Sequence, residues 1–365
     1  MKIKEVTQHL ERRFPLYLQE DFDNCGVQCG DIEQEITGAL ICFEMSEAVL
    51  DEAVQKGFNL VISHHPLILK RGIRRISPTD RVGKILYKAL VNNLVLYSMH
   101  TNIDSAEGGG NDAFAELLGL QNTQVLVPHS GLYGKVVVFV PTTHTQQVKD
   151  ALAATGCGVQ GNYDHCSYTM TGTGHFRPND QAHPFIGETA VEEDVAEDRV
   201  EMIFPIHLQR KVIQAIYKSH PYEEPAFDII RLENPSKTIG LGRIGMLPKE
   251  MDAHDFLEYI KEKMQVSTLR YYGAMDKKIK NVAVCGGGGA SFIGAAMAAG
   301  ADAYVSGDIK YHDFLDTDKQ MLLADIGHRE GEHFIKEIIY KEVKENFTTF
   351  ATEISKMDIL EILYI

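Results

Sequence analysis

The sequence predicts an α/β protein with parallel-rich sheets, and three observations support this prediction. Short strands rich in Val, Ile and Leu alternate with amphipathic helices in the first and last thirds of the chain, a pattern typical of parallel sheets covered on both faces. The middle third instead follows the order strand, helix, strand, strand, helix, strand, which is ferredoxin-like. At 365 residues the chain is long for one core, so we expect a discontinuous α/β core interrupted by an α+β insert.

The first third of the chain shows a regular alternation of elements. Ser46 is suited to cap a helix over 47–56, and Gly57 to end it. A second helix, over 81–92, has its apolar residues on one face. The predicted strands are 37–43, 59–63 and 94–98.

The last third repeats this alternation. Its predicted helices cover 290–299 and, approximately, 330–346. Ligands of open α/β sheets bind outside the carboxyl ends of the strands, so the residues that follow each strand are the candidates for function. The strands predicted here are 280–285, 303–306 and 320–325.

The middle third is predicted to be a separate domain, because turn residues such as Pro128 and Pro235 stand at both of its ends. An acidic stretch, 179–198, is expected to loop out of a long hairpin. The expected strands and helices are 134–140, 144–154, 167–175, 199–205, 208–218 and 226–232. The predicted organisation is therefore a first core part over 1–128, an insert over 129–235 and a second core part over 236–365.

Composition excludes several classes of protein. The net charge of −15 argues against broad nucleic-acid or anionic-membrane binding. No apolar run approaches the roughly 20 residues that span a bilayer, and residues 1–5 resemble a charged helix rather than a secretory signal. The six cysteines are scattered, as expected for reduced thiols in a cytoplasmic protein.

Histidines and carboxylates follow four of the predicted strands. His64 and His65 come after one strand, His100 and Asp104 after another, Asp308 after a third and His328 after a fourth. A single histidine at a strand end is usually an ordinary polar residue. Because several of them meet at one edge of the predicted sheet, the sequence predicts a metal site there.

The spacing of these residues favours two ions. Neighbouring residues at a strand end point in opposite directions, so His64 and His65 can serve one ion each. His328 and Glu332 are four residues apart and share a face if they lie on a helix, so that Glu332 can bridge the ions. Asp104 can complete the ligand set. Imidazole and carboxylate ligands suit zinc, and also iron or manganese.

These motifs resemble those of the Nif-three-like dinuclear metal-centre family, whose bacterial members are often called GTP cyclohydrolase I type 2 homologues. The resemblance covers roughly the first 125 and last 130 residues. It implies a toroidal hexamer, with two metals held by the residues matching His64, His65, Asp104, His328 and Glu332. Arg329 stands where the family commonly has an aromatic residue. The resemblance is carried by 23–31, 63–67, 100–104, 307–312 and 327–332.

The middle segment, including 220–225, resembles the insert of the longer bacterial members, which is similar to signal-transduction proteins of the P-two and CutA type. Two other features of the sequence each allow two interpretations. The glycines of 286–289 form either a tight turn or an anion site at a helix start. A basic run after His65 is either a phosphate-binding segment, with Arg74 and Arg75 as candidates, or a solvated loop. The run comprises Lys70, Arg71, Arg74, Arg75, Arg81 and Lys84.

The function predicted from these features is metal-dependent hydrolysis of a nucleotide or phosphoester, because paired ions can activate water and polarise a substrate oxygen. The alternative is a non-enzymatic metal-dependent binding or metal-handling regulatory protein with a ligand-sensing insert. Residues near the ligands are expected to support them or to meet a substrate. They are His100, Asp308, Lys310, Tyr311 and His312.

Overall fold

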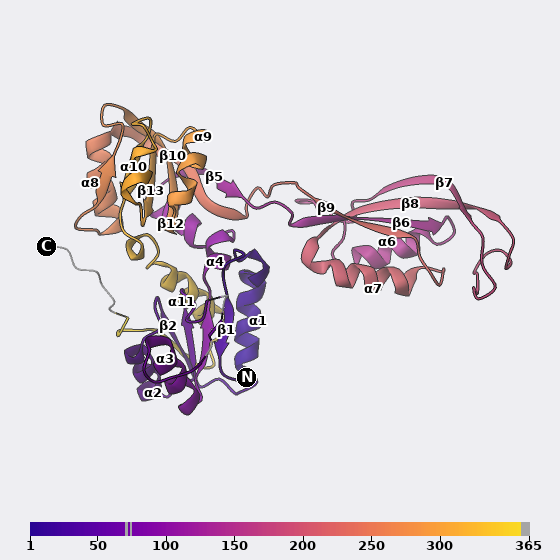
Figure 1. The fold of residues 1–365 in the computed structure, drawn as a ribbon, viewed down its shortest axis with the longest axis horizontal. Coiled ribbons are helices and arrows are strands. Elements are labelled where there is room, and N and C mark those ends of the chain that lie inside the picture. The colour runs from indigo at the N-terminus through magenta and orange to yellow at the C-terminus, as the bar shows by residue number, and fades with distance from the viewer. Residues whose placement is uncertain (70–71, 74, 359–365) are drawn as a thin grey trace. The chain divides into compact units, whose positions relative to one another are not determined.

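The computed structural model describes residues 1–69, 72–73 and 75–358. The chain divides into two compact units, one formed by 1–128 with 237–365 and the other by 129–236 (Figure 1). The first unit, called the core here, contains two mixed sheets with parallel and antiparallel strands. The predicted α/β class is therefore confirmed, and parallel pairs predominate in the sheet that contains β2 and β3.

The first sheet of the core has five strands, and its helices cover both faces. Leu96 packs in the hydrophobic cluster beneath α2 and α3, whereas the hydroxyl of its neighbour Tyr97 donates to Glu11 of α1. The helices are α1 (Ile3–Arg13), α2 (Glu47–Lys56), α3 (Arg81–Val91) and α11 (Ile335–Asn346). The strand order is β1 (Gly26–Cys29), β4 (Val95–Ser98), β3 (Leu60–Ser63), β2 (Gly38–Cys42) and β15 (Ala351–Ile354).

Local signals explain where α2 begins and ends. The Ser46 hydroxyl accepts a hydrogen bond from the Val49 backbone N–H, and Gly57 adopts a left-handed conformation with φ of 70°. Both features are those expected of a capped helix, and the observed bounds match the predicted helix over 47–56.

The second sheet of the core has six strands, with β12, β13 and β14 parallel and the others antiparallel. Two hydrophobic clusters pack on its faces, one with residues of α5 and α8 and the other with residues of α9. The strand order is β11 (Arg270–Tyr272), β14 (Leu322–Asp325), β13 (Ala303–Gly307), β12 (Lys278–Gly288), β10 (Gly240–Asp252) and β5 (Gln121–Pro128). The helices of this part are α4 (Thr101–Ser105), α5 (Gly110–Leu117), α8 (Ala253–Met264), α9 (Ile293–Ala298) and α10 (Tyr311–Leu315).

One expectation about the core is wrong. The histidine-bearing strand ends do not belong to one sheet, because the strands of the first and last thirds form separate sheets. Each parallel block ends on an antiparallel neighbour, β1 beside β4 and β11 beside β14. β1 and β11 are thus the terminal strands on one side of each sheet.

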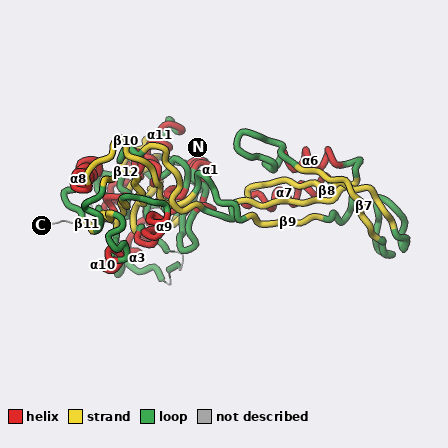
Figure 2. The backbone as a smooth tube through the Cα atoms, turned by 90° about the horizontal axis from the view of Figure 1, so that it is seen from above, coloured by secondary structure: helices red, strands yellow, loops and turns green. Residues whose placement is uncertain are grey.

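The second unit, called the insert here, is a four-stranded antiparallel sheet with two helices on one side (Figures 1 and 2). Its strand order is β7-β8-β6-β9. The expected loop over 179–198 is too long, because β8 already begins at Glu193. The likeness to P-two and CutA proteins stays a prediction. The elements are β6 (Tyr133–Pro141), α6 (Thr145–Ala153), β7 (Tyr168–Phe176), β8 (Glu193–Pro205), α7 (Gln209–Ser219) and β9 (Phe227–Leu232).

Short turns and thiols complete the fold. Each of the six cysteines is a free thiol. Within the described residues, no helix combines the length and apolar character needed to cross a bilayer. The 3₁₀ turns are Leu16–Leu18, Ile206–Leu208, Ala290–Phe292 and Arg329–Gly331.

Candidate metal centre

His64 and His65 lie directly after β3, where the chain still follows the neighbouring strand. The His64 and His65 N–H groups donate to the carbonyl oxygens of Cys42 and Phe43, both at 3.2 Å. The His64 side chain is completely buried, and 16% of the His65 side chain is exposed. The two rings lie 4.8 Å apart, centre to centre. The strand end therefore presents one inner and one outer imidazole.

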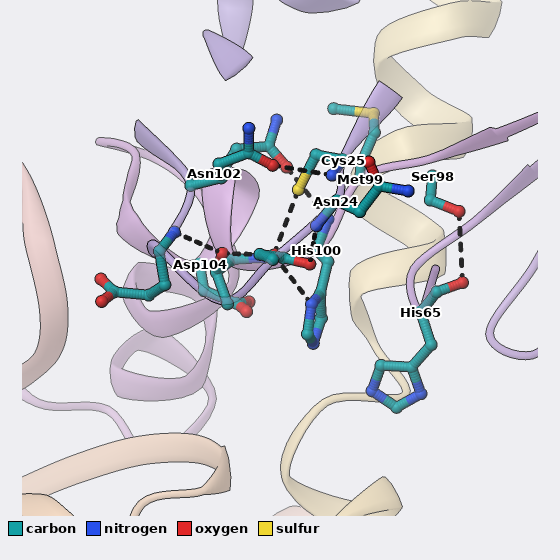
Figure 3. A network of polar contacts seen from close by, with 12 residues as sticks. Asn24, Cys25, His65, Ser98, Met99, His100, Asn102 and Asp104 are labelled. Atoms are coloured by element: carbon teal, nitrogen blue, oxygen red, sulfur yellow. Dashed lines mark hydrogen bonds and ion pairs between the residues drawn. The ribbon is translucent and has the colours of Figure 1, made fainter. Parts of the chain in front are cut away.

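His100 and Asp104 lie beyond β4, at either end of the first turn of α4 (Figure 3). The Asp104 N–H donates to the His100 carbonyl oxygen at 3.2 Å, which fixes the two side chains one turn apart. Nδ1 of His100 is 2.9 Å from Oδ2 of Asp23. The same Asp23 oxygen accepts hydrogen bonds from the backbone N–H and the hydroxyl of Thr101. Asp23 thus anchors the start of α4.

His328 and Glu332 follow β14, but not on one helix as expected. The chain turns at Gly327, with φ of 95°. It then makes the 3₁₀ turn Arg329–Gly331 and leaves it at Glu332, whose φ is −138°. Helix α11 begins only at Ile335. The 3₁₀ turn still brings Nε2 of His328 to 3.2 Å from Oε2 of Glu332.

Three imidazoles converge on one carboxylate oxygen. Oε2 of Glu332 lies 3.5 Å from Nε2 of His64, 3.3 Å from Nε2 of His65 and 3.2 Å from Nε2 of His328. Asp104 is next to this group, with its Oδ2 3.9 Å from Nε2 of His64. The core thus brings together all five residues predicted as metal ligands.

The potential ligand atoms form two sets that share Glu332. One set is His64, Asp104 and Glu332, and the other is His65, His328 and Glu332. Within each set the ligand atoms lie within 4.8 Å of one another. A third set joins His64 and His65 to His100. One carboxylate is therefore placed to serve two ions at once.

The other ring nitrogen of each imidazole is already engaged. Nδ1 of His64 donates to the Met99 carbonyl oxygen at 2.8 Å. Nδ1 of His65 donates to Glu44 at 2.6 Å, and Nδ1 of His328 to Asp308 at 2.8 Å. An oxygen acceptor on Nδ1 fixes the tautomer that leaves Nε2 free for a metal.

The pKa values of the three histidines differ because their surroundings differ. Burial lowers the pKa of His64 to about 4. Burial also opposes protonation of His65, but hydrogen bonds to Glu332 and Glu44 outweigh it and raise the pKa of His65 to about 10. The hydrogen bond to Glu332 raises the pKa of His328 to about 9. One imidazole is therefore neutral near pH 7, and two hold protons that a metal would displace.

The pKa values of the two buried carboxyl groups are shifted in opposite directions. Burial, reinforced by the charge of Glu332, raises the pKa of Asp104 well above its usual range. Burial alone would do the same to Glu332, but the imidazoles around it, His64 foremost, hold its pKa well below the usual range. Glu332 is thus an ionised carboxylate enclosed by nitrogen atoms.

The buried donor atoms of the cluster fit divalent ions. In the described part of the chain, Nε2 of His64 is buried and has no hydrogen-bond partner, and it lies 3.5 Å from Oε2 of Glu332. Buried polar atoms are rarely left unpaired, because each costs about 1–3 kcal/mol. An unprotonated nitrogen beside a carboxylate oxygen is the donor set that zinc, iron and manganese accept.

The glycines at 286–289 have a role in packing beside this cluster. Gly287 has φ of 62°, and a Cβ at this position would collide with Oε1 of Glu332. A Cβ on Gly286 would lie 3.1 Å from Cγ of Glu332. Gly286 and Gly287 therefore make room for the Glu332 side chain, so packing explains these glycines without an anion site.

A cavity of about 900 Å³ opens beside the cluster. His65, His100 and His328 lie in its wall, so at least part of the cluster faces the cavity. Apolar and arginine side chains form much of the remainder. They are Phe43, Leu69, Arg81, Leu269, Arg270, Ile326 and Arg329. A cavity of this size and lining suits a small-molecule ligand.

The remaining candidate residues are placed differently. Asp308 has φ of 54° and accepts the hydrogen bond from His328. Lys310, Tyr311 and His312 are exposed at the start of α10 and do not line the cavity. Arg75 is exposed, and it too is outside the cavity wall. Lys70, Arg71 and Arg74 lie outside the described residues.

Sequence reasoning missed three residues that support the site. Glu44 holds His65 and also pairs with Arg81 at 3.1 Å. It follows β2, so the rule that identified the histidines could have found it. Asp23 precedes β1 and was noted only as part of a family motif. Arg270 reaches the cavity while it pairs with Asp325, and no local signal marked it.

Comparisons with known proteins agree with this architecture. The family model Duf34/NIF3 (NGG1p interacting factor 3) matches residues 1–360. GTP cyclohydrolase 1 type 2 homologues of Halalkalibacterium halodurans and Bacillus subtilis are 39% and 38% identical, covering 93% and 96% of this chain and 90% and 93% of their own.

Solved structures show the same relationship. A Bacillus cereus protein related to NIF3 superposes with a TM-score of 0.81 at 37% identity, covering 100% of this chain and 99% of its own. A Staphylococcus aureus protein superposes with a TM-score of 0.80 at 29% identity, with the same coverage. The match over nearly the full length shows that this chain belongs to the Duf34/NIF3 family.

Proposed function

We propose that the core binds two divalent metal ions and hydrolyses a nucleotide or phosphoester in the adjoining cavity. The observation that supports this most directly is the convergence of three Nε2 atoms on Oε2 of Glu332. His64, Asp104 and Glu332 would hold the inner ion. His65, His328 and Glu332 would hold the outer ion. Zinc is the ion that the donor set suits best, with iron and manganese as alternatives.

Paired ions would supply a nucleophile near neutral pH and polarise the substrate oxygen under attack. The chain itself positions these groups. Glu44 and Asp308 fix the rings of His65 and His328. His100 lines the cavity and is held through Nδ1 by Asp23, which leaves Nε2 as the atom that can hold or pass a proton beside the substrate.

The substrate class follows from the cavity wall. Phe43, Leu269 and Ile326 offer apolar surface to a base. Arg329 lines the same cavity, and within the described residues its guanidinium has no ion pair. A planar cation without a partner is suited to bind a phosphate. The names of the relatives at 38–39% identity, homologues of a GTP cyclohydrolase, support a guanine nucleotide as the first substrate to test.

The experiment has two parts. Elemental analysis should find about two divalent ions per chain, and the metal-loaded protein should turn over at least one member of a nucleotide and phosphoester panel. Arg329→Ala should raise KM by about tenfold while both ions stay bound. Arg12→Ala removes an exposed cation of α1 and serves as the matched control.

The outcomes separate the alternatives. A metal content far below two would contradict the assigned centre. A full complement of metal with no turnover across the panel would favour the non-enzymatic alternative, a metal-dependent binding or metal-handling protein.

A further inference from the structure

The insert contains a cavity of its own, separate from the metal centre. Its volume is about 310 Å³, and every residue that lines it lies between Phe139 and Ala226, so it belongs to the insert alone. β7, β8, the 177–192 segment and the turn after α7 each contribute to its wall. This size lies at the lower end of the range for small-molecule sites.

Aromatic rings form a large part of this wall. The rings of Phe176 and Tyr222 are 5.8 Å apart at 64°, and those of Phe185 and Tyr222 are 6.4 Å apart at 51°. Phe139 adds a fourth ring. Rings set at such angles turn their faces in different directions around one space. Cation-binding aromatic cages have this arrangement.

Carboxylates complete the wall. Glu197, Glu223 and Glu224 all line the cavity. The Glu197 carboxylate lies against Gly174, where a Cβ would collide with Oε2, so a glycine is needed to accommodate it. Among the described residues, no Lys or Arg forms an ion pair with Glu197. This carboxylate therefore has no counter-ion inside the insert.

The basic side chains of the wall, Arg177 and His175, have partners other than Glu197. Nε of Arg177 donates to the Ala190 carbonyl oxygen at 3.1 Å, and His175 pairs with Asp194 at 2.8 Å. The Tyr222 hydroxyl is buried, and burial together with a hydrogen bond to Glu197 raises the pKa of Tyr222 above its usual range. Tyr222 therefore lies against the Glu197 carboxylate, which has no cationic partner among the described residues.

The 177–192 segment forms part of the cavity wall and is held by contacts to the rest of the insert. The His183 N–H donates to Oε1 of Glu223 at 2.8 Å. The Phe185 ring packs edge-on against His144 at 5.3 Å. These contacts hold Phe185 in the wall, so the cage is already formed before a ligand arrives.

We propose that this cavity binds a small organic cation with an alkylated ammonium group. The aromatic faces would surround the alkyl groups, and Glu197 would supply the opposite charge. The wall carries three carboxylates beside Arg177, so its charge balance disfavours an anion. A neutral ligand of equal shape would gain apolar contacts but leave Glu197 unpaired.

The test uses the metal-loaded full chain and choline as the probe. Calorimetry compares choline with its uncharged isostere, in which a tert-butyl group replaces the trimethylammonium group. Choline should bind at least about tenfold more tightly. Glu197→Gln keeps the shape of the side chain but removes its charge, and it should abolish most of this difference. Phe185→Leu should weaken choline binding by about threefold to tenfold.

Glu188→Gln provides the control, because Glu188 is an exposed carboxylate of the same segment that does not line the cavity. Its choline affinity should equal that of the wild type. Circular dichroism of each variant verifies that the insert is folded. Equal affinity for choline and its isostere, or no binding of either by the wild type, would overturn the proposal. So would an unchanged preference for choline in folded Glu197→Gln.

Discussion

The two proposed metal positions share Glu332 but differ in their exposure to solvent. The inner position has a completely buried His64 and an Asp104 whose side chain is 11% exposed. The outer position has His328 with 36% of its side chain exposed. The inner position depends on a backbone carbonyl, that of Met99, to fix its imidazole. The outer position depends on the side chains of Glu44 and Asp308.

Because they differ in exposure, the two metal positions are suited to different roles. A buried position has few routes for water and exchanges its ion slowly, so it is suited to hold the structure together. A position on the cavity wall is suited to meet a substrate. The inner ion is therefore expected to be retained more firmly than the outer one, and the following predictions test this expectation.

Loss of the shared ligand should have the largest effect. Glu332→Ala should reduce the metal content from about two ions per chain to less than about one, because each position loses a ligand. Elemental analysis after gel filtration measures this, with exposed Glu337→Ala as the control. A full metal complement in Glu332→Ala would show that this carboxylate does not bridge.

Separate removal of one inner and one outer ligand should give unequal results. His328→Ala should lose the outer ion and keep the inner one, leaving about one ion per chain. His64→Ala should weaken the inner position by at least about a hundredfold, since even supporting residues contribute tenfold to a hundredfold. Timed chelation followed by elemental analysis distinguishes them. Identical exchange curves for the two variants would remove the distinction between the positions.

The metal-free protein should respond to pH in opposite directions at the two positions. The pKa of His64 is lowered to about 4, so its contribution is present above pH 6.5 and lost as the pH falls towards 4. This contribution is about 3 kcal/mol. The pKa of His328 is raised to about 9, so its contribution is complete below pH 6.5 and lost as the pH rises through 9.

Urea unfolding of metal-free protein across this range measures both effects. His64→Gln should flatten the acid side of the stability profile, and His328→Gln the alkaline side. Each variant serves as the control for the other. Profiles that stay parallel to the wild type on both sides would contradict the assigned environments.

The smallest effect is expected from the groups that hold the outer imidazoles. Glu44→Gln keeps a side chain of equal size but weakens the hydrogen bond to Nδ1 of His65, and it should reduce affinity for the outer ion by about tenfold. Competition with a fluorescent chelator measures this affinity. Glu47→Gln, an exposed residue at the start of α2, should leave it unchanged. An effect on the inner ion instead would reverse the assignment of His65.

The sequence predicted those parts of the fold that depend on local signals. Ser46 and Gly57 define α2 within the chain itself, and runs of Val, Ile and Leu identified β3 and β4. The same runs located His64 and His100, because a residue just after a buried strand needs no long-range information to be recognised. The class of fold and the convergence of ligands at strand ends followed from this.

Long-range pairing could not be predicted in the same way. β10 pairs with β12 and also with β5, from which the whole insert separates it in sequence, and this alignment depends on the whole core. The turn at Glu332 was expected to be helical because its four-residue spacing from His328 suits a helix. The chain instead forms a 3₁₀ turn, which places Glu332 beside the His64 nitrogen that follows a strand of the other sheet. This contact exists only in the assembled core, so the local sequence could not predict it.

The pairing of β5 with β10 has a consequence for how this protein can vary in length. Pro128 lies opposite Gly240 in this antiparallel pair. The two ends of the insert are also joined, because the Ser236 backbone N–H donates to the His129 carbonyl oxygen at 2.8 Å. The whole insert therefore occupies the place of a hairpin loop. A gene that gained or lost this segment would leave both strand partners in register, so evolution can attach or discard a whole domain here without redesigning the core.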